Sequence, residues 1–153
     1  MGINSDMSVI VPTITFTASA NAFAYSGAEI IFSDCQSNNG LINTEYLEQA
    51  IQKSEKPVKI VVVVHLGGRL VDTKKIKALS RKYKFHIVED CCHAFGSFEI
   101  KNNQRQFIGS CENSLASTFS FHGTKNITSG EGGAITTKNK SVYKKILNYR
   151  NHG

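Results

Sequence analysis

The sequence of 153 residues contains no apolar run that approaches the ~20 residues required for a membrane-spanning helix. The apolar segment Ile60 to Val64 has the length of a buried strand. The N-terminus also lacks the basic region followed by an apolar segment that marks a secretory signal. We therefore expect a cytoplasmic protein that has no membrane partner.

The cysteines lack the paired two-residue spacing that is typical of zinc sites. They are Cys35, Cys91, Cys92 and Cys111. Adjacent Cys91 and Cys92 cannot readily form a disulfide with each other, and a cytoplasmic location disfavours disulfides in general. We interpret all of them as small buried side chains and predict no metal site.

Acidic residues are comparatively few, because 12 Asp and Glu stand against 18 Lys and Arg, and the formal net charge is +6. Such a charge can attract nucleic acid or anionic metabolites. The lysines are spread over several predicted helix faces, however, and no recognised nucleic-acid motif accompanies them. Solvated helix faces explain this pattern, so we predict no nucleic-acid partner.

Linkers rich in proline or glycine and internal repeats are also missing, and the length suits a single domain with a sizeable core. Predicted strands and helices alternate along the chain. Strands are predicted at 9–11, 29–33, 59–65, 85–89, 115–121 and 132–137. Helices are predicted at 17–26 and 141–148, with two more capped at Asn43 and Asp72, and a turn is predicted at 102–103.

The strand predicted at 59–65 contains four consecutive valines, a continuous apolar pattern that is typical of a strand covered on both faces. The loop before 132–137 is too short for a parallel crossover, so this strand is expected to run antiparallel. The alternation predicts an α/β fold, with a mostly parallel, doubly wound sheet and one antiparallel strand. Ligands bind such sheets at the carboxyl ends of the strands.

Polar side chains gather at these predicted carboxyl ends. Lys125 lies in the segment Ser120-Phe121-His122-Gly123-Thr124-Lys125-Asn126, and Asp90 and His93 follow the preceding strand. A lysine flanked by Ser, His and Gly, together with an acidic group and a histidine, is what an amine nucleophile in a polar cofactor cradle requires. This pairing predicts an imine between Lys125 and an aldehyde cofactor.

The chain contains, in this order, the segments Val11–Phe16, Val88–Asp90 with His93, Phe119–Asn126, Gly130–Gly133 and Arg150–Gly153. These segments resemble the DegT/DnrJ/EryC1/StrS family of sugar aminotransferases, which are pyridoxal-phosphate enzymes of fold type I that act on nucleotide-linked keto sugars. The resemblance implies pyridoxal 5'-phosphate as the cofactor and transamination as the reaction. It also implies that the fold is part of the large domain of a fold type I aminotransferase.

The resemblance assigns a role to each residue of the predicted site. Lys125 would carry the cofactor and then move a proton, Asp90 would pair with the protonated pyridine nitrogen, and His93 would hydrogen-bond the phenolic oxygen. Each residue has a plainer alternative. Lys125 could be an exposed loop lysine, Asp90 could cap a loop, and His93 could be a structural histidine whose hydrogen bonds are satisfied within the chain.

Three further residues are implied by the same resemblance. Ser120 would donate a hydrogen bond to the cofactor phosphate, and Phe16 would stack on the cofactor ring. His122 would face the sugar substrate or the neighbouring subunit. The alternatives are a solvent-facing strand serine for Ser120 and a core phenylalanine for Phe16.

Members of this family are considerably longer than this chain. The resemblance therefore implies that residues 1–153 are the central part of a large domain, without the N-terminal segment whose turn binds the cofactor phosphate and without the C-terminal small domain. It implies a homodimer for the full-length enzyme and glutamate as the amino donor. The segments His65–Gly68 and Gly109–Cys111 resemble the subgroup that aminates UDP-linked 4-keto-6-deoxy-hexosamines. The alternative is a non-catalytic remnant or assembly fragment of such an enzyme.

Overall fold

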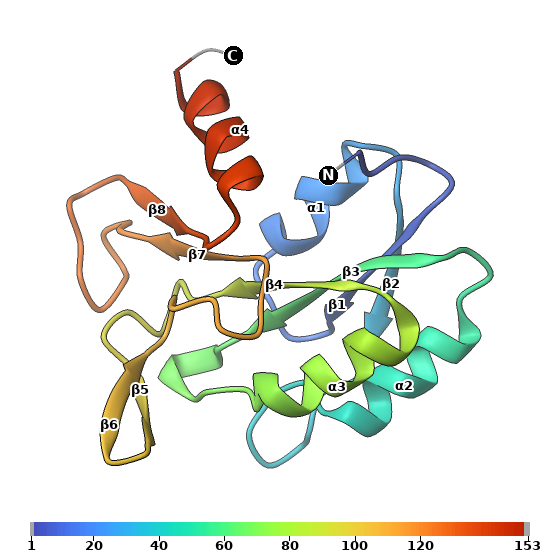
Figure 1. Ribbon diagram of the computed structural model, residues 1–153, viewed down its shortest axis with the longest axis horizontal. Helices are drawn as coiled ribbons and strands as arrows, with labels where there is room; N and C mark the ends of the chain where they lie inside the picture. The colour runs from blue at the N-terminus through green and yellow to red at the C-terminus, as the bar shows by residue number, and fades with distance from the viewer. Residues whose placement is uncertain (1, 152–153) are drawn as a thin grey trace.

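The structure is a computed structural model that describes residues 2–151, so the end of the predicted segment Arg150–Gly153 lies outside the described residues (Figure 1). The main sheet has six strands in the order β2-β1-β3-β4-β7-β8. Their bounds are β1 (Ser8–Pro12), β2 (Glu29–Ser33), β3 (Val58–Val64), β4 (His86–Asp90), β7 (Ala116–Ser120) and β8 (Gly133–Thr136). All neighbouring strands pair in parallel except β7 and β8, which pair antiparallel. The predicted mostly parallel sheet with one antiparallel strand is confirmed.

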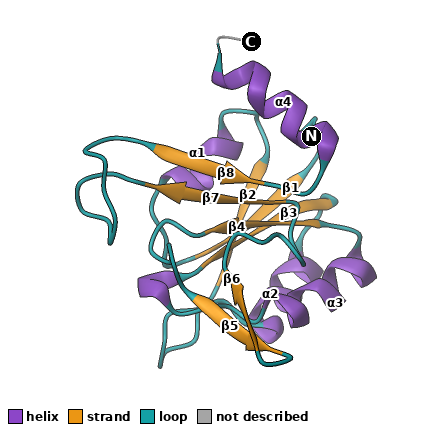
Figure 2. Ribbon diagram, turned by 60° about the vertical axis from the view of Figure 1, so that its left-hand side comes forward, coloured by secondary structure: helices purple, strands orange, loops and turns teal. Residues whose placement is uncertain are grey.

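Helices cover both faces of this sheet (Figures 1 and 2). Helices α2 (Thr44–Lys53) and α3 (Thr73–Tyr83) lie on one face, whereas α1 (Ala18–Ala24) and α4 (Lys140–Arg150) lie on the other. A short 3-10 turn, η1 (Leu66–Gly68), follows β3. None of the helices described in residues 2–151 combines the length and the apolar character needed to cross a membrane.

The core forms two layers because side chains alternate between the faces of each strand. The layer under α2 and α3 contains Ile10, Val61 and Val63 from the strands, and Leu47 and Ile76 from the helices. The other layer contains the alternate strand residues Val9, Val11, Ile60, Val62 and Val64, with Ala20 and Phe23 of α1 packed against them. The prediction that the valine-rich strand is covered on both faces is therefore confirmed.

The predicted helix caps are present. The side chain of Asn43 accepts a hydrogen bond from the backbone nitrogen of Tyr46 at 2.8 Å, and that of Asp72 accepts from Lys75 at 3.1 Å. Each cap satisfies an amide at the helix N-terminus that has no partner within the helix. These caps fix the starting points of α2 and α3 on the sheet.

A hairpin of β5 (Phe98–Lys101) and β6 (Gln104–Phe107) stands apart from the main sheet. Only its turn at Asn102 and Asn103 is predicted from the sequence, and both residues have the positive φ values, 49° and 61°, that a tight hairpin turn requires. The strands escape prediction because all but one of their residues are exposed, so no buried face gives them a clear apolar alternation.

We expect Gly133→Ala to destabilise the protein, because β8 approaches β7 closely at this residue. An added Cβ at Gly133 would lie 2.8 Å from the carbonyl oxygen of Phe119, a backbone atom that cannot turn away. Overpacking of this kind costs about 1–3 kcal/mol. Gly123→Ala is the matched control, since a Cβ at Gly123 would meet no atom within 4 Å. Denaturant unfolding measures both free energies, and equal losses for the two variants would contradict the close approach.

Candidate active site

The carboxylate of Asp90 lies at the carboxyl end of β4, between β3 and β7 in the sheet. Its Oδ1 accepts a hydrogen bond from the backbone nitrogen of Cys92 at 3.0 Å, and its Oδ2 accepts one from the hydroxyl of Ser19 at 3.0 Å. Ser19 in turn accepts from the hydroxyl of Thr15 at 2.7 Å. The carboxylate is therefore held in place by the loop after β4 and by the first turns of α1.

The loop that carries Lys125 is tied to the loop that follows Asp90. The side-chain amide of Asn126 donates to the carbonyl oxygen of Phe95 at 2.8 Å. The ring of Phe95 packs edge-to-face on Phe119 and Phe121, with centroid distances of 5.7 and 5.6 Å. The backbone nitrogen of Lys125 donates to the carbonyl oxygen of His122 at 3.0 Å, which closes a turn at the lysine.

The thiol of Cys92 is half-buried in the loop that follows Asp90. Burial raises the pKa of the Cys92 thiol to about 12, and its hydrogen bond with Asp90 and the charge of Asp90 add to the rise. The positive charge of Lys125 partly opposes this rise. Asp90 pairs with Thr118 in the register of β4 and β7, and Lys125 follows β7, so the predicted aspartate and the turn of the predicted lysine lie at the same end of the sheet.

The imidazole of His93 is exposed and lies in the loop after β4. Its Nδ1 accepts a hydrogen bond from the backbone nitrogen of Gly67 at 3.4 Å. A backbone amide can only donate, so the proton of the neutral ring is on Nε2. His93 therefore presents Nε2 as a donor.

Ser120 and His122 lie between the end of β7 and the lysine turn. The hydroxyl oxygen of Ser120 accepts from the backbone nitrogen of His122 at 3.3 Å, and the hydroxyl can still donate one hydrogen bond. The ring of His122 is exposed, with Nδ1 3.0 Å from the hydroxyl of Thr124 and Nε2 3.7 Å from the carboxylate of Glu131. His122 is thus held by its own loop.

Phe16 precedes α1 and is 75% exposed, which excludes the alternative of a core phenylalanine within this chain. Its carbonyl oxygen accepts from the backbone nitrogen of Ser19 at 3.0 Å, so it lies one turn from the serine that holds Asp90. A large exposed ring beside a polar cluster is available to contact a ligand. The stacking role itself stays a prediction.

Two buried polar residues, His65 and Glu89, were given no role in the sequence analysis. His65 Nε2 lies 2.9 Å from Glu89 Oε2, and the two residues are 0% and 4% exposed. Together with Cys91 they place three metal-binding atoms within 4.8 Å of one another. The polar atoms of His65 and Glu89 are already satisfied by hydrogen bonds, so their burial does not require an ion. Burial also raises the pKa of Cys91 well above its ordinary value, which disfavours the thiolate that binds a metal.

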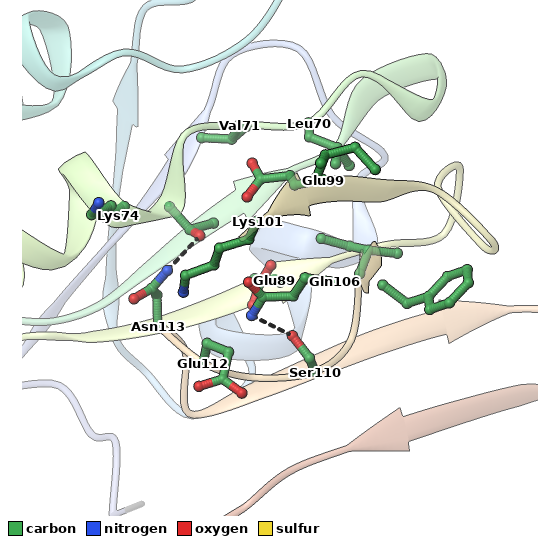
Figure 3. Close-up of a pocket in the computed structure, with 14 residues that line it drawn as sticks. Leu70, Val71, Lys74, Glu89, Glu99, Lys101, Gln106, Ser110, Glu112 and Asn113 are labelled. Atoms are coloured by element: carbon green, nitrogen blue, oxygen red, sulfur yellow. Dashed lines mark hydrogen bonds between the residues drawn. The ribbon is translucent and has the colours of Figure 1, made fainter. Parts of the chain in front are cut away.

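A cavity of about 170 Å³ opens between the start of α3 and the β5–β6 hairpin (Figure 3). Glu89 is among its lining residues, with Lys74, Glu99 and Lys101, but none of the described residues that line it belongs to the predicted site. Successive side chains of a strand point to opposite faces, so Glu89 faces this cavity and Asp90 faces α1. The predicted site therefore lies on the other face of the sheet.

Several curated relatives match the chain over its entire length. It is 36% identical to GDP-perosamine synthase from Escherichia coli O157:H7, of which it covers 40%. It is 37% identical to UDP-4-amino-4,6-dideoxy-N-acetyl-beta-L-altrosamine transaminase from Campylobacter jejuni strain 81-176, of which it covers 39%. The chain thus spans about 40% of the length of these relatives.

Solved structures show the same arrangement. An aminotransferase from Psychrobacter cryohalolentis superimposes with a TM-score of 0.87 at 33% identity, covering 99% of this chain and 36% of that one. NtdA from Bacillus subtilis, with bound cofactor PMP, superimposes with a TM-score of 0.81 at 29% identity, covering 97% of this chain and 31% of that one. The model of the DegT/DnrJ/EryC1/StrS aminotransferase family matches residues 1–153, and the chain belongs to this family.

Proposed function

We propose that the chain is the central part of the large domain of a pyridoxal-phosphate-dependent aminotransferase that converts a nucleotide-linked keto sugar to an amino sugar. The observation that carries this proposal is that Asp90 and the turn of Lys125 lie at the same end of the sheet. The carboxylate is held by Ser19 and Cys92, and the two loops are joined by the hydrogen bond from Asn126 to Phe95. This chemistry requires a carboxylate to pair with the ring nitrogen of the cofactor and an amine to react with its aldehyde.

The residues present fit the pyridoxal cofactor. Asp90 Oδ2 accepts one hydrogen bond, from Ser19, and retains a lone pair for a protonated ring nitrogen. The Nε2 donor of His93 suits the phenolic oxygen, and the exposed ring of Phe16 offers a stacking surface. When bound, the cofactor withdraws electrons from the carbon that exchanges its amino group. In this reading Lys125 holds the cofactor and then moves the proton at that carbon.

The names of the relatives support a nucleotide sugar as the substrate class. One is named for a GDP-linked product and the other for a UDP-linked amino sugar. We propose the UDP-linked 4-keto-6-deoxy-hexosamine, because His65–Gly68 and Gly109–Cys111 resemble that subgroup. Glutamate is the proposed amino donor, and His122, exposed beside the lysine turn, is the proposed contact to the sugar or the neighbouring subunit.

A larger, dimeric assembly is part of the proposal. Helices α1 and α4 contain no buried residue, and they lie on the same side of the sheet as the proposed site. The large apolar side chains of Tyr25 and Tyr149 are 86% and 80% exposed. Further chain or a second subunit that packs on this side would cover these surfaces, and would supply the backbone donors for the cofactor phosphate that Ser120 alone cannot provide.

Borohydride reduction of the chain incubated with pyridoxal 5'-phosphate should attach the cofactor to Lys125. The expected result is a visible absorption band before reduction and a single modified peptide after it, identified by mass spectrometry. Lys125→Arg should lose both, whereas Lys53→Arg, in α2 on the opposite face, should keep both. Modification of another lysine with Lys125 free would refute the assignment, and the lack of any band would favour a non-catalytic remnant.

Ser120→Ala should weaken the binding of pyridoxal 5'-phosphate by about 1.5–3 kcal/mol, because it removes one charge-assisted hydrogen bond to the phosphate. Ser120→Thr retains a hydroxyl and should recover most of the affinity. Fluorescence titration of the cofactor measures all three dissociation constants. Equal affinities of Ser120→Ala and the unmodified chain would show that Ser120 does not bind the phosphate.

The complete enzyme should transfer nitrogen and not remove a hydroxyl group from its sugar. Some relatives in this family have a histidine in place of the lysine and dehydrate the sugar, whereas Lys125 is present here. Incubation with glutamate and a UDP-linked 4-keto sugar should yield 2-oxoglutarate and an amino sugar in equal amounts, measured by mass spectrometry. A deoxygenated sugar without added nitrogen would exclude transamination.

A further inference from the structure

His65 directly follows β3 and is completely buried, and its surroundings fix where its ring proton lies. Nδ1 accepts a hydrogen bond from the backbone nitrogen of Val71 at 3.1 Å. Because an amide can only donate, Nδ1 carries no proton, and the neutral ring has its proton on Nε2. The Nε2–H group donates a hydrogen bond to Glu89 Oε2, with 2.9 Å between Nε2 and Oε2.

The carboxylate of Glu89 connects His65 to two further strands of the sheet. Glu89 lies on β4, and its Oε1 accepts hydrogen bonds from the hydroxyls of Ser114 and Ser117. Ser117 lies on β7 directly beside Glu89 in the strand register. Three donors thus converge on one buried carboxylate, and the network crosses β3, β4 and β7 behind the proposed site.

The same network contacts both ends of the loop that follows β3. The backbone nitrogen of His65 donates to the carbonyl oxygen of Asp90 at 3.0 Å, and the ring of His65 holds Val71. The segment between them is therefore fixed at both ends. Within it lies Gly67, with a φ of 59°, whose amide donates to Nδ1 of His93 at 3.4 Å.

We propose that His65 and Glu89 are positioning residues for His93. They hold the segment Leu66–Val71 so that the amide of Gly67 keeps His93 in the Nε2–H tautomer, the form that can donate to an anionic oxygen. The tautomer follows from this chain alone. Only the identity of the acceptor, the phenolic oxygen of the pyridoxal cofactor, rests on the proposed function.

Stability alone does not explain a buried pair of this kind. Replacing a buried ion pair and its hydrogen bonds by apolar side chains of similar volume often leaves the stability unchanged or raises it. A contribution to the free energy of unfolding therefore does not explain why a histidine and a glutamate occur here. Ligand-binding histidines, in contrast, are commonly oriented by a partner on their other ring nitrogen. For His93 this partner is the backbone amide of Gly67, and His65 together with Glu89 holds that amide in position.

The tautomers can be measured in the chain without cofactor, by long-range proton–nitrogen NMR correlation on protein with labelled histidine. Both His65 and His93 should be in the Nε2–H form. In His65→Phe, a ring of similar size without nitrogen, His93 should lose its single tautomer and show a mixture. Glu89→Gln retains an acceptor for His65 and should retain the Nε2–H form of both rings. Glu99→Gln is the control, because Glu99 lines the same cavity as Glu89. It should leave the tautomers of both histidines unchanged.

Two outcomes overturn the proposal. One is an Nδ1–H tautomer of His93 in the unmodified chain, a result that requires no variant. The other is an unchanged Nε2–H tautomer of His93 in folded His65→Phe. If His65→Phe does not fold, Glu89→Leu removes the acceptor of His65 at similar volume, and an unchanged His93 there is equally decisive. Retained dispersion of the backbone amide signals identifies the folded variants.

Cofactor titration tests whether the network of His65 and Glu89 also affects the binding of the cofactor. The tautomer measurement does not depend on this result. His65→Phe and His93→Ala should each weaken the binding of pyridoxal 5'-phosphate about tenfold, the effect of one hydrogen bond, and the double variant should be no weaker than His93→Ala. If the unmodified chain binds no cofactor, a non-catalytic remnant is favoured for this chain, and the tautomer result stands. If it binds and the two effects add fully, His65 does not act through His93, and the positioning role is refuted.

Discussion

Strand β4 lies between β3 and β7, and its last two side chains point to opposite faces of the sheet. Glu89 points toward the cavity beside α3, where it accepts a hydrogen bond from His65, and Asp90 points toward α1, where Ser19 holds it. The pleat of an extended strand imposes this division, since consecutive side chains cannot share a face. A buried polar network and an open polar site are therefore separated by one residue of backbone.

The two faces of the sheet differ in how completely they are covered. The layer under α2 and α3 joins four strands to two capped helices, and Leu47 and Ile76 are almost fully buried within it. On the other face, α1 and α4 have no buried residues. Segments with little buried surface open most easily, and binding sites are drawn from such segments. The stability of this chain thus comes mainly from the face opposite the one that carries the proposed chemistry.

Much of the fold could be predicted because its signals are local. The caps at Asn43 and Asp72 and the valine run of β3 each identify an element without reference to the rest of the chain. The pairing of His65 with Glu89 could not be predicted in this way. These residues are separated by 24 positions and meet only through the register of β3 and β4, which periodicity does not reveal. The available signal was two polar residues in strongly apolar surroundings, a histidine directly after four valines and a glutamate within a buried strand.

The site residues also differ in whether the sequence could predict their arrangement. Asp90 and Ser120 are the last residues of β4 and β7, and Lys125 follows β7. The carboxyl ends of parallel strands meet at one edge of a sheet, so the common location of these residues follows from topology. The orientation of His93 does not, because it depends on an amide of Gly67 in a separate loop whose position is fixed from the far face of the sheet. Sequence motifs therefore identify the groups that can react. The buried contacts behind them determine which nitrogen of His93 carries the proton, and hence whether that residue can donate.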